Sequence, residues 1–120
     1  MSATSLSAAR CGGSPCAILD VRAASQFAIS ALLGSVSCPL ADLQRESHLR
    51  GEAGLDALLL RVGLSEAHVA SGQPVYVMCR RGVDSVTATR LLRARGLAAF
   101  NVTGGLTAWA AAVDASFPLY

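Results

Sequence analysis

The chain has 120 residues, enough for one compact domain and too few for two. Hydrophobic residues make up 52% of it, so a core can form without a disulfide framework, and we expect the four cysteines to be free thiols in a reducing compartment, the cytoplasm. The formal net charge of +2 argues neither for nor against nucleic-acid binding, and no apolar run approaches the roughly 18 residues that cross a membrane. We expect the protein to contact neither nucleic acid nor a membrane directly.

The N-terminal part of the chain is predicted to lead from a linker into a sheet. Residues 1–15 are small and polar and end in Gly-Gly-Ser-Pro, which predicts a flexible arm or linker ahead of a domain over 16–120. The apolar run CAILDV at 16–21 predicts a buried strand. Residues 23–33 have mixed character with one helical turn, and a glycine and a proline bracket a second short strand at 35–38.

The middle of the chain predicts surface segments and helix. Residues 40–50 are polar and are expected to run over the surface. Leucines recur at helical spacing within 53–62, which predicts a helix that ends at Gly63. Residues 65–72 indicate another turn or short helix.

The C-terminal part alternates strand and helix. We expect a strand at 75–78, a helix at about 85–95 that stops at Gly96, a strand at 97–102 and a last helix opened by Gly104 and the glycine after it. This alternation is typical of an α/β domain with right-handed crossovers and a parallel sheet covered by helices on both faces. The chain carries neither of the two common glycine-rich phosphate motifs, so nothing indicates nucleotide binding.

Cys79 stands at the abrupt end of the apolar strand 75–78, where ligands bind in parallel sheets. The short segment 80–84 joins it to a helix that starts near Ser85. Successive backbone N–H groups in such a turn, together with the positive end of the helix, form an anion site that favours a thiolate. The loop therefore predicts a nucleophilic cysteine.

The charged neighbours of Cys79 act in opposite directions. Arg80 and Arg81 strengthen the anion site if either side chain faces the loop, whereas Asp84 opposes it unless it caps the helix. Neither histidine lies in a motif that would activate the thiol, so the backbone must do so. The alternative is that Cys79 is a small buried hydrophobic residue, although such a residue does not need an Arg-Arg-Gly turn after it.

Two chemistries use a thiolate in such a loop. Cysteine-dependent phosphatases clamp the phosphate with an arginine six residues after the cysteine, and that position here is Ser85. Sulfur transfer needs the cysteine and the loop without that arginine, because the N–H groups stabilise a persulfide. The sequence favours sulfur transfer over phosphoester hydrolysis.

Four motifs in order resemble those of a known family: AILDVR at 17–22, GSVSCPL at 34–40, VYVMCRRGVDS at 75–85 and VTGGLTAWAAAVD at 102–114. Together they resemble the rhodanese-like domain. The resemblance implies a single α/β domain with a central, mostly parallel sheet of about five strands and helices on both faces.

The loop and the C-terminal stretch are most similar to the C-terminal rhodanese domain of the eukaryotic adenylyltransferase–sulfurtransferases that serve molybdenum cofactor synthesis and tRNA thiolation. The resemblance implies that Cys79 carries a persulfide, with no other cofactor. The expected partners are a sulfur donor (a persulfide protein such as a cysteine desulfurase, or thiosulfate), a ubiquitin-like sulfur-carrier protein and a fused or separate adenylation domain. The substrate-binding loop would consist of Arg80, Arg81, Gly82, Val83, Asp84 and Ser85. The remaining alternative is a non-catalytic rhodanese module used for interaction.

Asp20 and Arg22, at the end of the first predicted strand, are expected to support the structure and not to take part in catalysis. A carboxylate at a strand end most often holds neighbouring loop N–H groups. Gln26 stands where many rhodaneses have a glutamate, which removes one partner for Arg22. Trp109 is expected to anchor the last helix in the core.

The sequence assigns no role to the other cysteines or to the helix arginines, although Cys16 could resolve a persulfide if it lies near Cys79. Cys11 and Cys16 form a Cys-x4-Cys pair without a second pair, so neither they nor other residues predict a metal site. Cys38 is expected in the core. The three arginines of the helix at 85–95 predict a solvated face, or a docking face for an acidic partner: Arg90, Arg93 and Arg95.

Overall fold

The computed structural model describes residues 1–11 and 17–118, with the side chains of 1–8 and 17–118. This part of the chain contains one parallel sheet of four strands in the order β2-β1-β3-β4. The strands are β1 (Ala17–Asp20), β2 (Ser35–Ser37), β3 (Pro74–Met78) and β4 (Ala98–Asn101). The α/β class and the parallel sheet are confirmed, with four strands where the resemblance implies about five.

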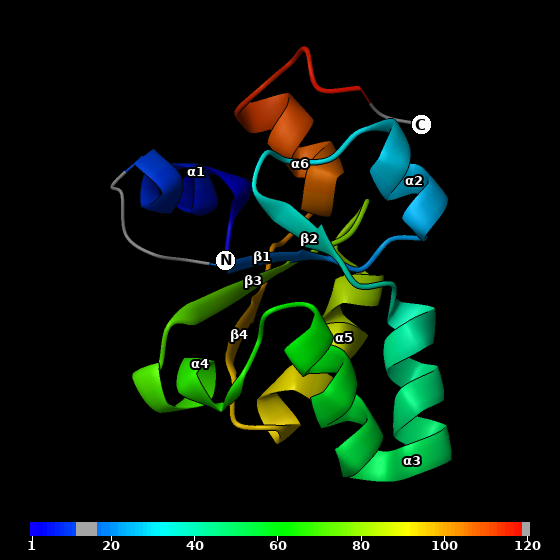
Figure 1. Ribbon diagram of the computed structural model, residues 1–120. Coiled ribbons are helices and arrows are strands. Elements are labelled where there is room, and N and C mark those ends of the chain that lie inside the picture. The colour runs from blue at the N-terminus through cyan, green and yellow to red at the C-terminus, as the bar shows by residue number, and fades with distance from the viewer. Residues whose placement is uncertain (12–16, 119–120) are drawn as a thin grey trace.

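Helices cover both faces of the sheet, as predicted. The helices are α1 (Ala3–Cys11), α2 (Ala24–Ile29), α3 (Leu40–Arg61), α4 (Glu66–Ser71), α5 (Asp84–Ala94) and α6 (Gly105–Ala112). Figure 1 shows α3, α4 and α5 on one side of the sheet and α1, α2 and α6 on the other.

The alternation of side chains along the strands divides the core into two clusters. Val75 and Val77 of β3 are fully buried in the cluster that contains residues of α3 and α5. Their neighbours Tyr76 and Met78 are buried in the other cluster, with residues of α1 and α6. Because successive strand residues point to opposite faces, an uninterrupted apolar run is what a strand buried on both faces requires.

The N-terminal segment differs from the prediction. Residues 3–11 form a helix and not a loose arm, and the side chain of Leu6 is fully buried in the same cluster as Leu106 and Trp109. Alanine and serine make the segment polar on average, so the buried positions Ala3 and Leu6, one helical turn apart, give a weak periodic signal. The predicted domain start at residue 16 lies outside the described residues.

The segment 40–50 also differs from the prediction, because it is the first part of α3 and not an irregular surface segment. Leu43 is fully buried there. The helix bends at Gly51, whose φ of 60° and ψ of −140° are not helical. The part predicted over 53–62 is confirmed, and it carries most of the buried leucines of α3.

The carboxyl ends of the strands place the polar residues of the site at one edge of the sheet. Asp20 ends β1, Asn101 ends β4, and Cys79 directly follows β3 between them. Within 1–11 and 17–118, no helix is long and apolar enough to cross a membrane.

Candidate active site

The sulfur of Cys79 lies in a small set of hydrogen-bonding groups. The residue is 4% exposed. The Gly82 N–H donates to Sγ at 3.0 Å, and the Ser85 Oγ lies 3.2 Å from the same sulfur. The loop thus brings a backbone donor and a hydroxyl to one thiol, and the N–H group aimed at the sulfur favours its anionic form.

Gly82 is needed for this geometry for two reasons. Its φ is +81°, in the left-handed region that favours glycine. A Cβ there would also lie 2.7 Å from the Gly104 backbone nitrogen and 3.2 Å from the Val102 carbonyl oxygen. A larger residue would push the loop away from the segment that follows β4.

The start of α6 holds the loop from the other side. The Leu106 N–H donates to the Cys79 carbonyl and the Thr107 N–H to the Arg80 carbonyl, both at 2.9 Å. Gly105 allows this approach, because a Cβ at that position would overlap the Cys79 carbonyl oxygen. The first N–H groups of a helix lack partners within it, and here they bind the carbonyls of the loop.

The charged loop residues occupy different places. All four of Arg80, Arg81, Val83 and Asp84 are exposed; Arg80 and Asp84 also line a cavity next to Cys79, whereas Arg81 and Val83 do not. Helix α5 begins at Asp84, and its N-cap, Val83, makes no side-chain capping bond. The Asp84 carboxylate therefore lies in the first helical turn, where negative charge is favourable, and stays exposed at the cavity wall.

The cavity beside Cys79 has a volume of about 500 Å³. Its polar lining comes from the loop and from Arg22, Gln26 and Gln44, and its apolar lining includes Val21, Pro39 and Leu40. Nothing in the sequence indicates Gln44 as a site residue. It is distant from Cys79 in the sequence and reaches the cavity only because of the way the chain folds.

Asp20 and Arg22 form a buried ion pair next to this cavity. The Arg22 Nη2 lies 2.7 Å from Asp20 Oδ2, and the Arg22 backbone N–H donates to Oδ1 at 3.0 Å. The same Nη2 donates to the Ser30 carbonyl at 2.6 Å. The pair joins the end of β1 to the end of α2 and thereby shapes one wall of the cavity.

Asn101 is a second site residue, besides Gln44, that the sequence analysis missed. The fully buried Ser85 hydroxyl donates to Asn101 Oδ1. Asn101 Nδ2 donates to the Gly82 carbonyl at 3.4 Å. The sequence shows only a polar residue near the end of a predicted strand, and the place of that strand beside the strand of Cys79 comes from the fold.

The remaining cysteines lie apart from this geometry or outside the described residues. Cys38 is 1% exposed. Burial, with a smaller effect of the Asp42 carboxylate, raises the pKa of its thiol to about 11. Nothing is described of Cys16 or of the Cys11 side chain. Among the described residues, no three or more His, Cys, Asp or Glu side chains group as they would around a metal ion.

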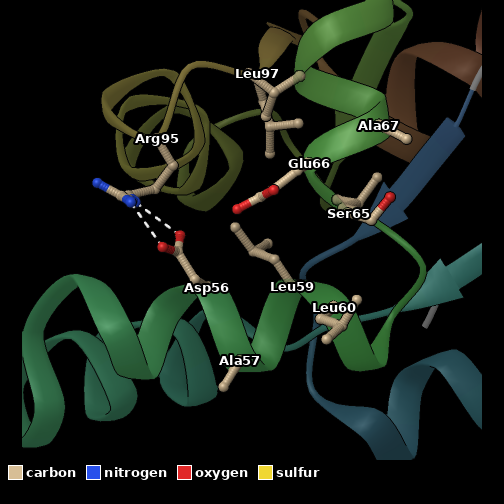
Figure 2. A pocket seen from close by; sticks show the side chains of 11 residues that line it. Asp56, Ala57, Leu59, Leu60, Ser65, Glu66, Ala67, Arg95 and Leu97 are labelled. Carbon is tan, nitrogen blue, oxygen red and sulfur yellow. Dashed lines mark hydrogen bonds and ion pairs between the residues drawn. The ribbon is translucent and has the colours of Figure 1, made fainter.

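A second cavity, of about 590 Å³, lies between α3 and α4 (Figure 2). At its edge Arg95 donates to both carboxylate oxygens of Asp56, at 2.8 and 2.7 Å, and this lowers the pKa of Asp56. Arg93 donates to the Ala99 carbonyl at 2.6 Å and lies over the Phe100 ring. Two of the three predicted surface arginines are therefore engaged by their own domain.

Comparison with known proteins shows the family of the chain. The family model "rhodanese-like domain" matches residues 2–112. The chain is 38% identical over 109 residues to the adenylyltransferase and sulfurtransferase MOCS3 of Oryza sativa subsp. japonica. The alignment covers 90% of this chain and 23% of that protein. It is 34% identical over 103 residues to the adenylyltransferase and sulfurtransferase UBA4 of Yarrowia lipolytica, covering 86% of this chain and 22% of that protein.

Among solved structures, the human single-domain sulfurtransferase TSTD1 aligns with a TM-score of 0.71 at 23% identity, over 93% of this chain and 95% of that one. This likeness shows a shared fold. The chain spans less than a quarter of the two relatives above, which are longer proteins with other parts.

Proposed function

The chain belongs to the rhodanese-like domain family, and on that premise we propose that it is a sulfurtransferase with Cys79 as its nucleophile. One observation carries the proposal: the Cys79 sulfur meets the Gly82 N–H and the Ser85 hydroxyl beside a cavity of about 500 Å³. The sulfurtransferase relatives support the same activity.

The proposed first step loads sulfur onto Cys79. The thiolate attacks the outer sulfur of thiosulfate, the sulfur–sulfur bond of thiosulfate breaks, and sulfite leaves with the electron pair. A persulfide protein would serve in the same way, with its thiolate as the leaving group. The product is a Cys79 persulfide, and no cofactor is required.

The loop is suited to hold the charge of that persulfide. The Gly82 N–H already donates to the sulfur. The backbone N–H groups at the start of α5, at Asp84 and Ser85, add partial positive charge. Arg80 lines the same cavity and would attract an anionic donor.

For the acceptor we propose the C-terminal glycine of a ubiquitin-like sulfur-carrier protein, activated by adenylation in a fused or separate domain. The names of the two relatives, which pair adenylyl transfer with sulfur transfer, support this. The persulfide attacks the adenylated carboxyl carbon and AMP leaves. Two thiols of a reductant then become a disulfide, which releases the thiocarboxylate and returns Cys79. As part of the same proposal, the chain acts in the cytoplasm. Its sulfur serves molybdenum cofactor synthesis, tRNA thiolation or both.

The geometry disfavours phosphoester hydrolysis. The position of the phosphate-clamping arginine holds Ser85, which is fully buried and bonded to Asn101. No group with the fork geometry of arginine takes that place in the loop.

Turnover of thiosulfate with cyanide tests the proposal, because cyanide removes the outer persulfide sulfur as thiocyanate and regenerates the thiolate. We expect the chain to produce thiocyanate and sulfite, Cys79→Ser to produce neither, and Cys38→Ala to retain turnover. Equal turnover by Cys79→Ser would overturn the assignment. If neither thiosulfate nor a persulfide protein loads sulfur onto the chain and no turnover is seen, the proposal is wrong. The alternative, a non-catalytic interaction module, would then hold.

A further inference from the structure

Asn101 closes a ring of hydrogen bonds around the Cys79 sulfur. From Sγ the ring runs to the Ser85 hydroxyl at 3.2 Å and on to Asn101 Oδ1. It returns from Asn101 Nδ2 to the Gly82 carbonyl at 3.4 Å and from the Gly82 N–H to Sγ at 3.0 Å. One side chain at the end of β4 thus contacts both residues that contact the sulfur.

The orientation of the Asn101 amide follows from its partners. The Gly82 carbonyl accepts hydrogen bonds and cannot donate, so the amide must turn Nδ2 toward it and Oδ1 toward Ser85. A serine hydroxyl has one hydrogen. Because that hydrogen is given to Asn101, the Ser85 oxygen faces the sulfur as an acceptor, which suits a protonated Cys79.

We propose that Asn101 is a positioning residue that competes with Cys79 for the single Ser85 hydrogen and so controls ionisation of the nucleophile. When the thiol loses its proton to solvent, the hydroxyl turns to donate to the sulfur, and Asn101 Oδ1 loses its donor. The competition withholds the hydrogen from the sulfur until the sulfur is charged. This role rests on Cys79 being the nucleophile of the proposed function.

Other charged groups near Cys79 contribute a constant background to its ionisation. Arg80 and Asp84 come from its own loop and the start of α5, and Arg22, paired with Asp20, comes from β1 and the turn after it. The cavity residues from α2 and α3 include Gln26 and Gln44, which carry no charge. The Met1 ammonium donates to the Asn101 backbone carbonyl at 2.8 Å, and neither this group nor the side chains above are altered in identity when the Asn101 side chain is replaced.

The rate of Cys79 alkylation across pH tests the proposal. Trypsin cleaves at the arginines and places Cys79 as the sole cysteine of peptide 62–80, so its modification can be followed separately. We expect Asn101→Ala to free the Ser85 hydrogen, move the alkylation profile to lower pH and raise the rate at neutral pH about fivefold. The nearly isosteric Asn101→Asp should bind that hydrogen more strongly, add negative charge, and slow alkylation about fivefold or more.

The Ser85→Ala background provides the control. Without the hydroxyl, Asn101→Ala should no longer shift the profile, because its effect acts through Ser85. Shifts of both Asn101 variants in the same direction, unchanged profiles, or the same Asn101→Ala shift without Ser85 would overturn the proposal. Thermal melts check that each variant is folded. Alkylation needs no sulfur donor, so failed sulfur loading with the expected shifts would sink the proposed function alone.

Discussion

Cys38 and Cys79 each directly follow a parallel strand, and their surroundings nevertheless differ. Cys79 has a backbone N–H aimed at its sulfur from a glycine turn. Cys38 is followed by Pro39, which has no N–H to offer, and lies 1% exposed in the apolar core. A thiol at the end of a strand therefore becomes a candidate nucleophile only when the following loop supplies donors.

The raised pKa of Cys38 predicts a pH effect on stability. Below its ordinary value of 9.0 the thiol is protonated in the folded and the unfolded chain, and this contribution is fully present. Between pH 9.0 and about 11 the unfolded chain loses the proton while the folded chain keeps it, so the free energy of unfolding falls. Thermal melts across this range should show a steeper decline for the native chain than for Cys38→Ala; parallel declines would contradict the prediction.

The Asp20–Arg22 pair predicts a large loss of stability when one partner is removed. Arg22→Ala leaves the Asp20 carboxylate, 1% exposed, without its cation, and should cost about 3 kcal/mol in the free energy of unfolding. The matched control is Arg45→Ala, which breaks the exposed pair with Asp42 and should cost less than about 1 kcal/mol. Urea unfolding of both variants measures these losses in the free energy of unfolding. Equal losses would show that the buried pair contributes no more to stability than the exposed pair.

At the scale of elements, the loop after β3 is held by the start of α6 as much as by its own sequence. The N–H groups of Leu106 and Thr107 bind the carbonyls of Cys79 and Arg80. Helix α6 in turn is anchored by Trp109, which is 6% exposed in the core cluster. The cysteine loop and the Gly-Gly-x-x-x-Trp helix are therefore two halves of one site.

Gly105→Ala tests this coupling between loop and helix. The new Cβ would overlap the Cys79 carbonyl, and the φ of +57° is strained for alanine. We expect at least about a tenfold loss of thiosulfate turnover, because the loop must move by more than a catalytic geometry tolerates. Gly34→Ala, at a φ of +83° with open space around it, is the control for backbone strain and should retain turnover. Similar losses in both would argue against the coupling.

The elements that the sequence predicts well are those with an unbroken local signal. The strand before Cys79 is a run of apolar residues. Gly63 and Gly96 each follow the end of a helix, α3 and α5, within two residues. Helix α1 and the first half of α3 were missed because each buries few side chains, and Leu6 and Leu43 become informative only once the sheet that covers them is known. Local composition cannot report burial against a distant element.

At the scale of the whole molecule, the parallel sheet converts distant segments into one site. Asp20, Cys79 and Asn101 end or follow three neighbouring strands and therefore meet at one edge. The loop at 80–85 could be predicted because its residues are contiguous. Asn101 and Gln44 could not, because their roles depend on strand order and on how α3 packs beside the sheet.

The mass of peptide 62–80, after incubation of the reduced protein with thiosulfate or a persulfide protein and trapping by alkylation, tests the central claim most directly. We predict one added sulfur on that peptide, lost on treatment with cyanide, and none on the peptides that carry the other cysteines. Added sulfur only on another cysteine, or none on any peptide with either donor, would contradict the assignment of Cys79 as the residue that carries sulfur.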